Sequence, residues 1–117
     1  MGLAIAAYRE DHNGEYPSTG QPGNGYGSLA LLYPDYVSYV RLFVCPSDPD
    51  IDGQQVAAMP NWSLGPHTCS YIYNDTVKAS DPPDSMVLYD KHADIHNGGR
   101  NVLLSDGRVV WVTAADF

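Results

Sequence analysis

The chain has 117 residues, enough for one globular domain with a modest hydrophobic core. Its formal net charge of -8 at pH 7 argues against binding to nucleic acids, whose phosphates attract Lys and Arg, and against docking on an anionic membrane surface. Basic surfaces and hard cations such as calcium are partners that this charge permits.

The first predicted element is a helix over residues 1–13. Its apolar side is formed by Met1, Leu3, Ile5 and Tyr8, together with the alanines. Gly14 follows as a residue suited to a helix end. The apolar run has no capping residue before it, so we expect the helix to be the end of a longer one that begins upstream.

Turn-forming residues dominate the middle of the chain. The glycines and prolines of residues 14–27 predict a loop. Ser28 is placed to cap a short helix over residues 29–33, which Pro34 would end. An extended run is expected at residues 42–45, followed by a long ordered loop over residues 54–69.

The second half predicts β-structure. Residues 69–74 alternate as a strand does, and residues 86–89 predict another strand. The dipeptide Asp106-Gly107 between two apolar runs predicts a β-hairpin with a type I′ turn, in which Trp111 anchors the core-facing side. The expected fold is therefore α+β, with residues 1–117 as one domain: an N-terminal helix packed on a small antiparallel sheet drawn from residues 70–113.

The two cysteines, Cys45 and Cys69, are too few for a zinc site by themselves. A cysteine pair in a small, Tyr-rich, Lys-poor domain predicts one disulfide and an oxidising compartment. Two free, buried thiols are the alternative.

An acidic run in the middle of the chain has the opening spacing of an EF-hand calcium loop. It consists of Asp48, Asp50 and Asp52, followed by Gly53. Met59 stands where that loop would need its bidentate glutamate, so a calcium site here would need further ligands. A solvated acidic turn is the alternative.

The segment before the hairpin carries His92, Asp94 and His96 at alternate positions. If extended, it would present them on one face as ligands for zinc or another transition metal, with Asp90 as a further ligand. In the alternative, His96 hydrogen-bonds the loop ahead of the hairpin, with Asp106 as one candidate partner. No nucleophile elbow or phosphate-binding glycine loop is present, so we expect no enzymatic activity.

Four motifs in order resemble one family of exported proteins. They are the helix with the following Asp11-His12-Asn13-Gly14, the Phe43-x-Cys45-Pro46-Ser47-Asp48 block, the Tyr71-x-Tyr73-Asn74 strand, and His96 followed after nine residues by Asp106-Gly107. Together they are similar to type IV pilin-like and type II secretion pseudopilin-like proteins with the prepilin-type processing-associated H-x(9)-D-G domain.

The resemblance implies a structural subunit of a pilus-like filament or a secretion pseudopilus. The helix would run into the filament core, the sheet would face outward, and the partners would be other copies or other pilin-like subunits. It implies an exported, cell-surface or extracellular domain that meets the membrane only through a hydrophobic segment upstream of residue 1. The alternative is an extracellular calcium- or glycan-binding module without catalysis.

Overall fold

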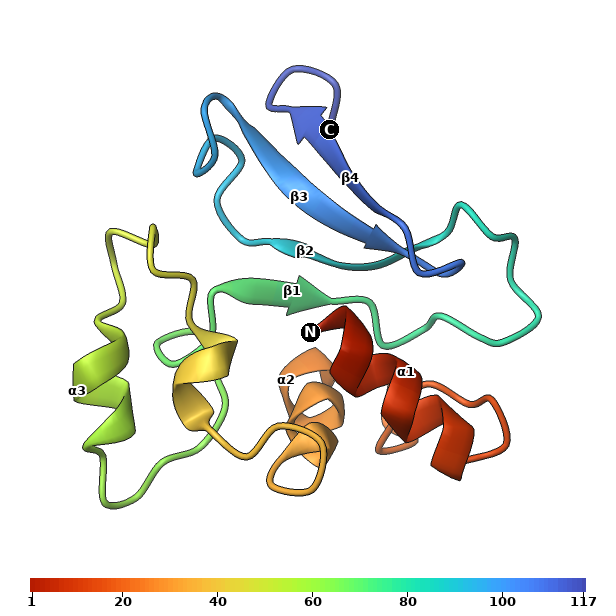
Figure 1. Cartoon of the computed structure of the whole chain (residues 1–117), viewed down its shortest axis with the longest axis horizontal. Coiled ribbons are helices and arrows are strands. Elements are labelled where there is room, and N and C mark those ends of the chain that lie inside the picture. The colour runs from red at the N-terminus through yellow and green to blue at the C-terminus, as the bar shows by residue number, and fades with distance from the viewer.

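The structure, a computed structural model, describes all 117 residues and has an α+β fold (Figure 1). Three α-helices and two 3-10 helices precede a four-stranded sheet. In chain order the elements are α1 (Gly2–Asp11), α2 (Gly25–Leu29), η1 (Ala30–Leu32), η2 (Val40–Phe43), α3 (Gly53–Ala57), β1 (Tyr71–Tyr73), β2 (Met86–Asp90), β3 (Gly99–Leu104) and β4 (Val109–Thr113). The prediction of an N-terminal helix followed by a sheet from the second half is confirmed.

The sheet is antiparallel throughout, with strand order β1-β2-β3-β4. Tyr71 pairs with Asp90, and Leu103 pairs with both Leu88 and Val109. The β2–β3 register shifts between Met86 and Leu88. Because each strand pairs with the next one in the chain, β1 and β4 are the two edges.

The hairpin lies where the sequence predicts it, but its turn is of another type. Leu103 pairs with Val109, so the loop between Leu104 and Arg108 consists of the three residues 105–107. Of these three, only Gly107 has a positive φ, of 91°. The bonds from Leu104 N to Arg108 O and from Gly107 N to Leu104 O close a three-residue loop. The type I′ turn is therefore wrong, because a three-residue loop needs a left-handed residue only at its last position.

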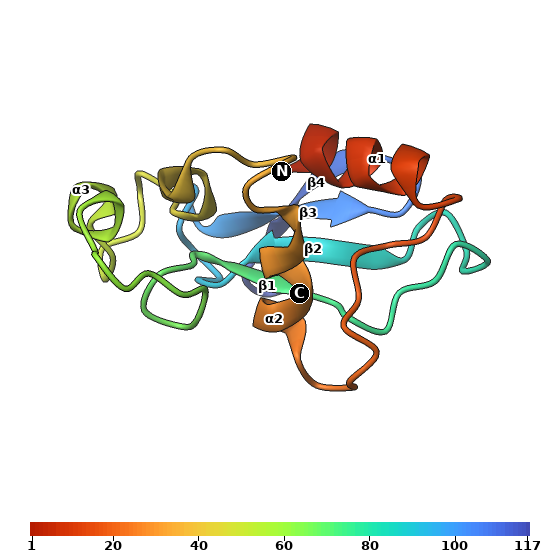
Figure 2. The same cartoon turned by 90° about the horizontal axis from the view of Figure 1, so that it is seen from below.

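The helix α1 lies across one face of the sheet (Figure 2). Its single buried residue is Ile5, and Met1, Ala4 and Tyr8 pack against the same core while partly exposed. Leu3 is 90% exposed, so its predicted place on the buried side is wrong. A helix of ten residues is only marginally stable by itself, so α1 depends on the packing of Ile5 against the core for its stability.

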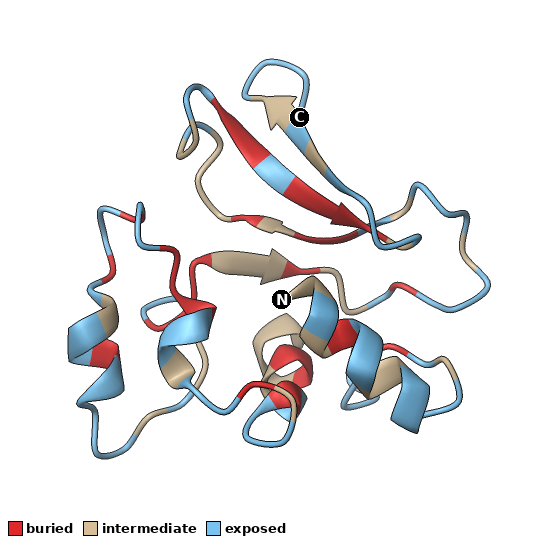
Figure 3. Ribbon diagram, viewed as in Figure 1, coloured by how far each residue is buried: buried red, intermediate tan, exposed pale blue.

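The core gathers between the sheet and the segment that contains α2 and η1 (Figure 3). Leu29, Leu32 and Phe43 are all 0% exposed there. The predicted cap is wrong: Asn24 caps α2 through Gly27 N, whereas Ser28 is buried and accepts from Thr19 N.

Two further expectations are corrected at the other end of the molecule. The extended run predicted at 42–45 begins as η2, and only from Val44 is the backbone extended. The loop predicted over 54–69 begins with α3, which Asp52 caps through Gln54 N. A capping aspartate followed by helix-compatible residues is sufficient to start a short helix. In Figure 1, α3 lies at the opposite end of the molecule from α1.

Trp111 does not anchor the core. It is 51% exposed, and Val109 on the same strand is 63% exposed. Both point to the face that carries Leu103, the side against which Gly2 of α1 lies. This face of β4 is thus left uncovered beside α1. No helix here combines the length and hydrophobicity needed to cross a bilayer.

Candidate functional site

Two loops that are far apart in the sequence meet beside the sheet. One follows η2 and carries Cys45 and Asp48, and the other follows β2 and carries His92 and His96. Their contacts form two separate groups of potential metal ligands. We call these the Cys45 cluster, made of Cys45, Asp90 and His96, and the Asp48 cluster, made of Asp48, Asp50 and His92.

The Cys45 cluster is centred on one imidazole nitrogen. Nε2 of His96 lies 3.3 Å from Oδ2 of Asp90 and 3.8 Å from Sγ of Cys45. The three donor atoms all lie within 4.8 Å of one another. Cys45 is 5% exposed and the Asp90 side chain 3%, whereas the His96 side chain is 31% exposed. A sulfur, a nitrogen and an oxygen thus converge at a site that opens to solvent on the histidine side.

The backbone around the Cys45 cluster is fixed by several hydrogen bonds. Asn101 N donates to Oδ2 of Asp90 at 2.8 Å, which orients that carboxylate. His96 N donates to the Gly99 carbonyl, and Nε1 of Trp111 donates to the His96 carbonyl at 2.8 Å. A Cβ at Gly99 would lie 2.5 Å from the Trp111 ring, so only glycine lets the indole lie there. Trp111 therefore holds the backbone of the His96 loop in place through its indole hydrogen bond, a role that the sequence did not predict.

The Asp48 cluster is built around a carboxylate whose side chain is 0% exposed. Asp48 accepts hydrogen bonds from Asp50 N at 2.9 Å, Ser70 Oγ at 2.8 Å and His92 Nε2 at 3.1 Å. Burial raises the pKa of Asp48, but the bonds from Asp50 and Ser70 and the nearby positive charges of His92 and Lys91 outweigh burial and lower the pKa overall. The protein itself supplies the donors that this buried charge needs.

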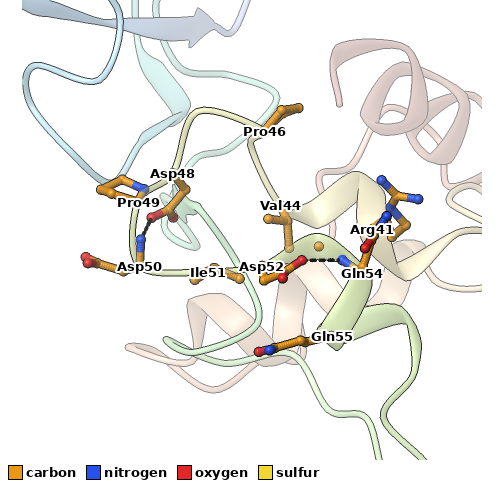
Figure 4. A pocket seen from close by; sticks show the side chains of 11 residues that line it. Arg41, Val44, Pro46, Asp48, Pro49, Asp50, Ile51, Asp52, Gln54 and Gln55 are labelled. Atoms are coloured by element: carbon orange, nitrogen blue, oxygen red, sulfur yellow. Dashed lines mark hydrogen bonds between the residues drawn. The ribbon is translucent and has the colours of Figure 1, made fainter.

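The acidic run is only partly brought together. Figure 4 shows Asp48 turned toward Asp50 N and Asp52 turned toward Gln54 N. These residues line a hollow of about 540 Å³. The carboxylate of Asp52 accepts from Gln54 N at 2.9 Å and caps α3. Because Asp52 is engaged there, the structure joins two of the three predicted ligands, and calcium binding stays a prediction.

The predicted histidine metal site is divided between the two clusters. His92 joins Asp48 and Asp50, whereas His96 joins Cys45 and Asp90, and the exposed Asp94 belongs to neither cluster. An extended segment would place both histidines on one face, but residues 91–97 form bends and turns instead. Asp90, the further ligand that we expected, lies beside His96, and metal binding there stays a prediction. The contact of Cys45 with His96 could not be read from local spacing.

His96 and Asp106 do not meet, because they lie at opposite ends of β3. Asp106 accepts from Arg108 N at 3.0 Å and from Arg108 Nε at 2.6 Å. The hydrogen bond from the Arg108 backbone has the largest effect and the one from its side chain the next, and together they hold the pKa of Asp106 below its usual value. Asp106 is therefore a residue that stabilises the turn, and Gly107 supplies the positive φ.

The predicted disulfide between Cys45 and Cys69 is not formed, and both thiols are free. The two side chains face different surroundings. Sγ of Cys45 lies beside His96, whereas Cys69 is 0% exposed in the main core and its thiol contacts the Tyr71 carbonyl. Burial raises the pKa of the Cys69 thiol to about 11, which makes this sulfur unreactive.

Comparisons of the chain with protein-family models, with curated proteins and with solved structures found no match.

Proposed function

We propose that this chain is a structural subunit of an extracellular pilus-like filament or secretion pseudopilus. The proposal rests on the order of motifs that resembles pilin-like proteins and on one structural observation. That observation is the uncovered apolar surface formed by α1 and β4 on one face of the sheet. In this proposal the fold is pilin-like, and the chain acts by assembly with further copies or related subunits rather than by catalysis.

The apolar surface begins at α1. Leu3 is 90% exposed on this helix, while Ile5 is buried against the core. On strand β4, Val109 is 63% exposed and Trp111 is 51% exposed. A cavity of about 290 Å³ whose lining includes Gly2 and Val109 lies between the two elements. Large exposed apolar side chains are the kind that mark a contact with another protein, and the proposal takes Leu3, Val109 and Trp111 as this contact.

The strand β4 adds backbone groups to this surface. It is an edge of the sheet, so its outer side has no paired neighbour. The exposed side chains from β4 are those of Val109 and Trp111. In the proposed filament, α1 faces the shared interior and the long loops of the molecule face outward.

Immunogold electron microscopy of the source cells tests the proposal, with antibodies raised against this chain. Long labelled filaments would support a pilus, and short labelled structures at the envelope would support a pseudopilus. Label confined to the cell interior, or dispersed monomers only, would refute the assembly role and the extracellular location together.

A pair of variants tests the surface itself. Leu3→Asp places a charge at the proposed contact and is expected to lower the yield of sheared filaments at least about tenfold, as a loss of about 1.4 kcal/mol of contact energy implies. Met59→Asp is the matched control, because Met59 is 41% exposed and follows α3 at the other end of the molecule. Equal yields from both variants would show that α1 is not a subunit contact.

A further inference from the structure

We propose that Cys45, Asp90 and His96 form a zinc-binding site with one coordination position open to the neighbouring cavity. The proposal does not depend on the filament role, because it rests only on the geometry of the Cys45 cluster.

The two donor separations measured from His96 Nε2 fit the edges of a tetrahedron around zinc. Zinc bond lengths of about 2.0–2.1 Å to nitrogen or oxygen and about 2.3 Å to sulfur give edges of about 3.3 Å between nitrogen and oxygen and about 3.6 Å between nitrogen and sulfur. The observed edges from His96 Nε2 are 3.3 Å to Asp90 and 3.8 Å to Cys45. These two edges match the expected values to within about 0.2 Å, and all three donors lie within 4.8 Å of one another, so small side-chain shifts would close them around a zinc ion.

Hydrogen bonding alone leaves the Cys45 cluster less fully satisfied than the Asp48 cluster. A charged imidazole–carboxylate bond is usually about 2.7–2.9 Å long, and the His96–Asp90 separation is 3.3 Å. The His92 contacts of the Asp48 cluster are also longer than this, at 3.1 and 3.2 Å, so distance alone does not separate the two clusters. The difference is that Asp48 accepts two further hydrogen bonds, from Asp50 N and Ser70 Oγ at 2.9 and 2.8 Å, whereas the Asp90 carboxylate accepts one, from Asn101 N at 2.8 Å. The Asp48 cluster is thus complete without a metal, whereas the Cys45 cluster holds a buried thiol and a carboxylate that share one imidazole nitrogen.

The sharing of one nitrogen also argues against a catalytic triad. In a triad the nucleophile and the acid contact opposite nitrogens of the imidazole, so that one orients the ring while the other exchanges a proton. Here Cys45 and Asp90 both face Nε2 of His96. The arrangement is one of convergent ligands rather than of a proton relay.

Neighbouring groups hold these ligands in place. Asn101 N binds the Asp90 carboxylate, and Trp111 Nε1 binds the His96 carbonyl. Such outer contacts orient the ligands of protein metal sites. The three ligands also line the cavity of about 290 Å³, whose walls include Leu88, Asn101 and Leu103. A fourth ligand, water or an external donor, would enter from this cavity. On binding, the Cys45 thiol releases its proton to solvent and coordinates as the thiolate.

Cobalt binding to the reduced, metal-stripped chain tests the site. We expect one Co²⁺ per chain, with a thiolate-to-metal charge-transfer band in the near ultraviolet, and displacement of cobalt by Zn²⁺, which binds such sites more tightly. Cys45→Ser should abolish the band, and His96→Gln should weaken binding at least about tenfold, within the range for loss of a supporting or ligating group. Asp50→Asn, a change in the other cluster, should leave the band and the affinity unchanged.

Circular dichroism of each variant checks that it folds. His96→Gln decides the question should Cys45→Ser fail to fold, because the His96 side chain is 31% exposed and tolerates replacement. Absence of cobalt binding, binding without the charge-transfer band, or a band that survives Cys45→Ser would each overturn the proposal.

Discussion

Replacement of Asp48 by asparagine tests whether the buried carboxylate holds the two loops together. The side chain is 0% exposed and accepts hydrogen bonds from Asp50 N, Ser70 Oγ and His92 Nε2. Asparagine has nearly the same volume, but one carboxylate oxygen is replaced by an NH2 group. This group would face a donor, either Ser70 Oγ or Asp50 N. A hydrogen bond to a charged group contributes about 1.5–3 kcal/mol, and a buried donor left without a partner costs about 1–3 kcal/mol. Because these effects overlap, we expect Asp48→Asn to lower the free energy of unfolding by about 2–4 kcal/mol at pH 7.

Urea denaturation followed by circular dichroism, in the presence of a chelator, measures this loss. Asp50→Asn is the matched control, since the Asp50 side chain is 68% exposed and its contact with His92 is partly screened by water. The control should lose less than about 1 kcal/mol. A loss below about 0.5 kcal/mol for Asp48→Asn would show that the buried carboxylate does not hold the loops.

The pH dependence supplies a second check with a definite sign. The pKa of Asp48 is lowered in the folded chain, because hydrogen bonds from Asp50 and Ser70 outweigh the effect of burial. A lowered folded pKa means that the contribution of the carboxylate is complete above the unfolded pKa of about 3.9, and is lost as the pH falls through the folded value. The difference between wild type and Asp48→Asn should therefore be constant near neutral pH and shrink below about pH 4. A difference that stays constant down to pH 2 would contradict this reasoning.

Three further predictions concern the core, the Trp111 indole and one tyrosine. Phe43→Ala should lower the free energy of unfolding by about 3–5 kcal/mol in urea titrations, because Phe43 is 0% exposed. Gly99→Ala should cost about 1–3 kcal/mol and shift the fluorescence of Trp111, because the new methyl group would meet the indole ring at 2.5 Å. The hydrogen bond to Asp11 raises the pKa of Tyr36 to about 12, so Asp11→Asn should lower it toward 10 in an ultraviolet titration; an unchanged value would show that this bond does not act in solution.

The elements that sequence reasoning placed correctly are those set by local chemistry. The apolar pattern of residues 1–13 predicts α1, and Asp106-Gly107 marks the hairpin because glycine reaches the positive φ that the loop needs. The side chains on these elements were harder to place. Leu3 and Trp111 were expected in the core, yet both are exposed, because burial depends on which part of a face another element covers.

The acidic run shows how one pattern serves several roles. Alternate aspartates predict a calcium loop, but in the structure Asp48 becomes a buried acceptor and Asp52 caps a helix. The capping role was readable in principle, because Asp52 precedes residues compatible with a helix. The burial of Asp48 was not, because its donor Ser70 is 22 residues away in the sequence.

The candidate site could not be predicted from spacing, because Cys45 and His96 are 51 residues apart and meet only after the sheet has formed. One hydroxyl links the two clusters: Ser70 Oγ accepts from Cys45 N at 2.9 Å and donates to Asp48 at 2.8 Å. Asp48 therefore fixes the backbone from which the Cys45 thiol projects, in addition to closing its own cluster. The Asp48 cluster, whose buried carboxylate is satisfied by hydrogen bonds from the protein, thus preorganises the Cys45 cluster. The proposed metal would therefore meet ligands that the fold has already brought together.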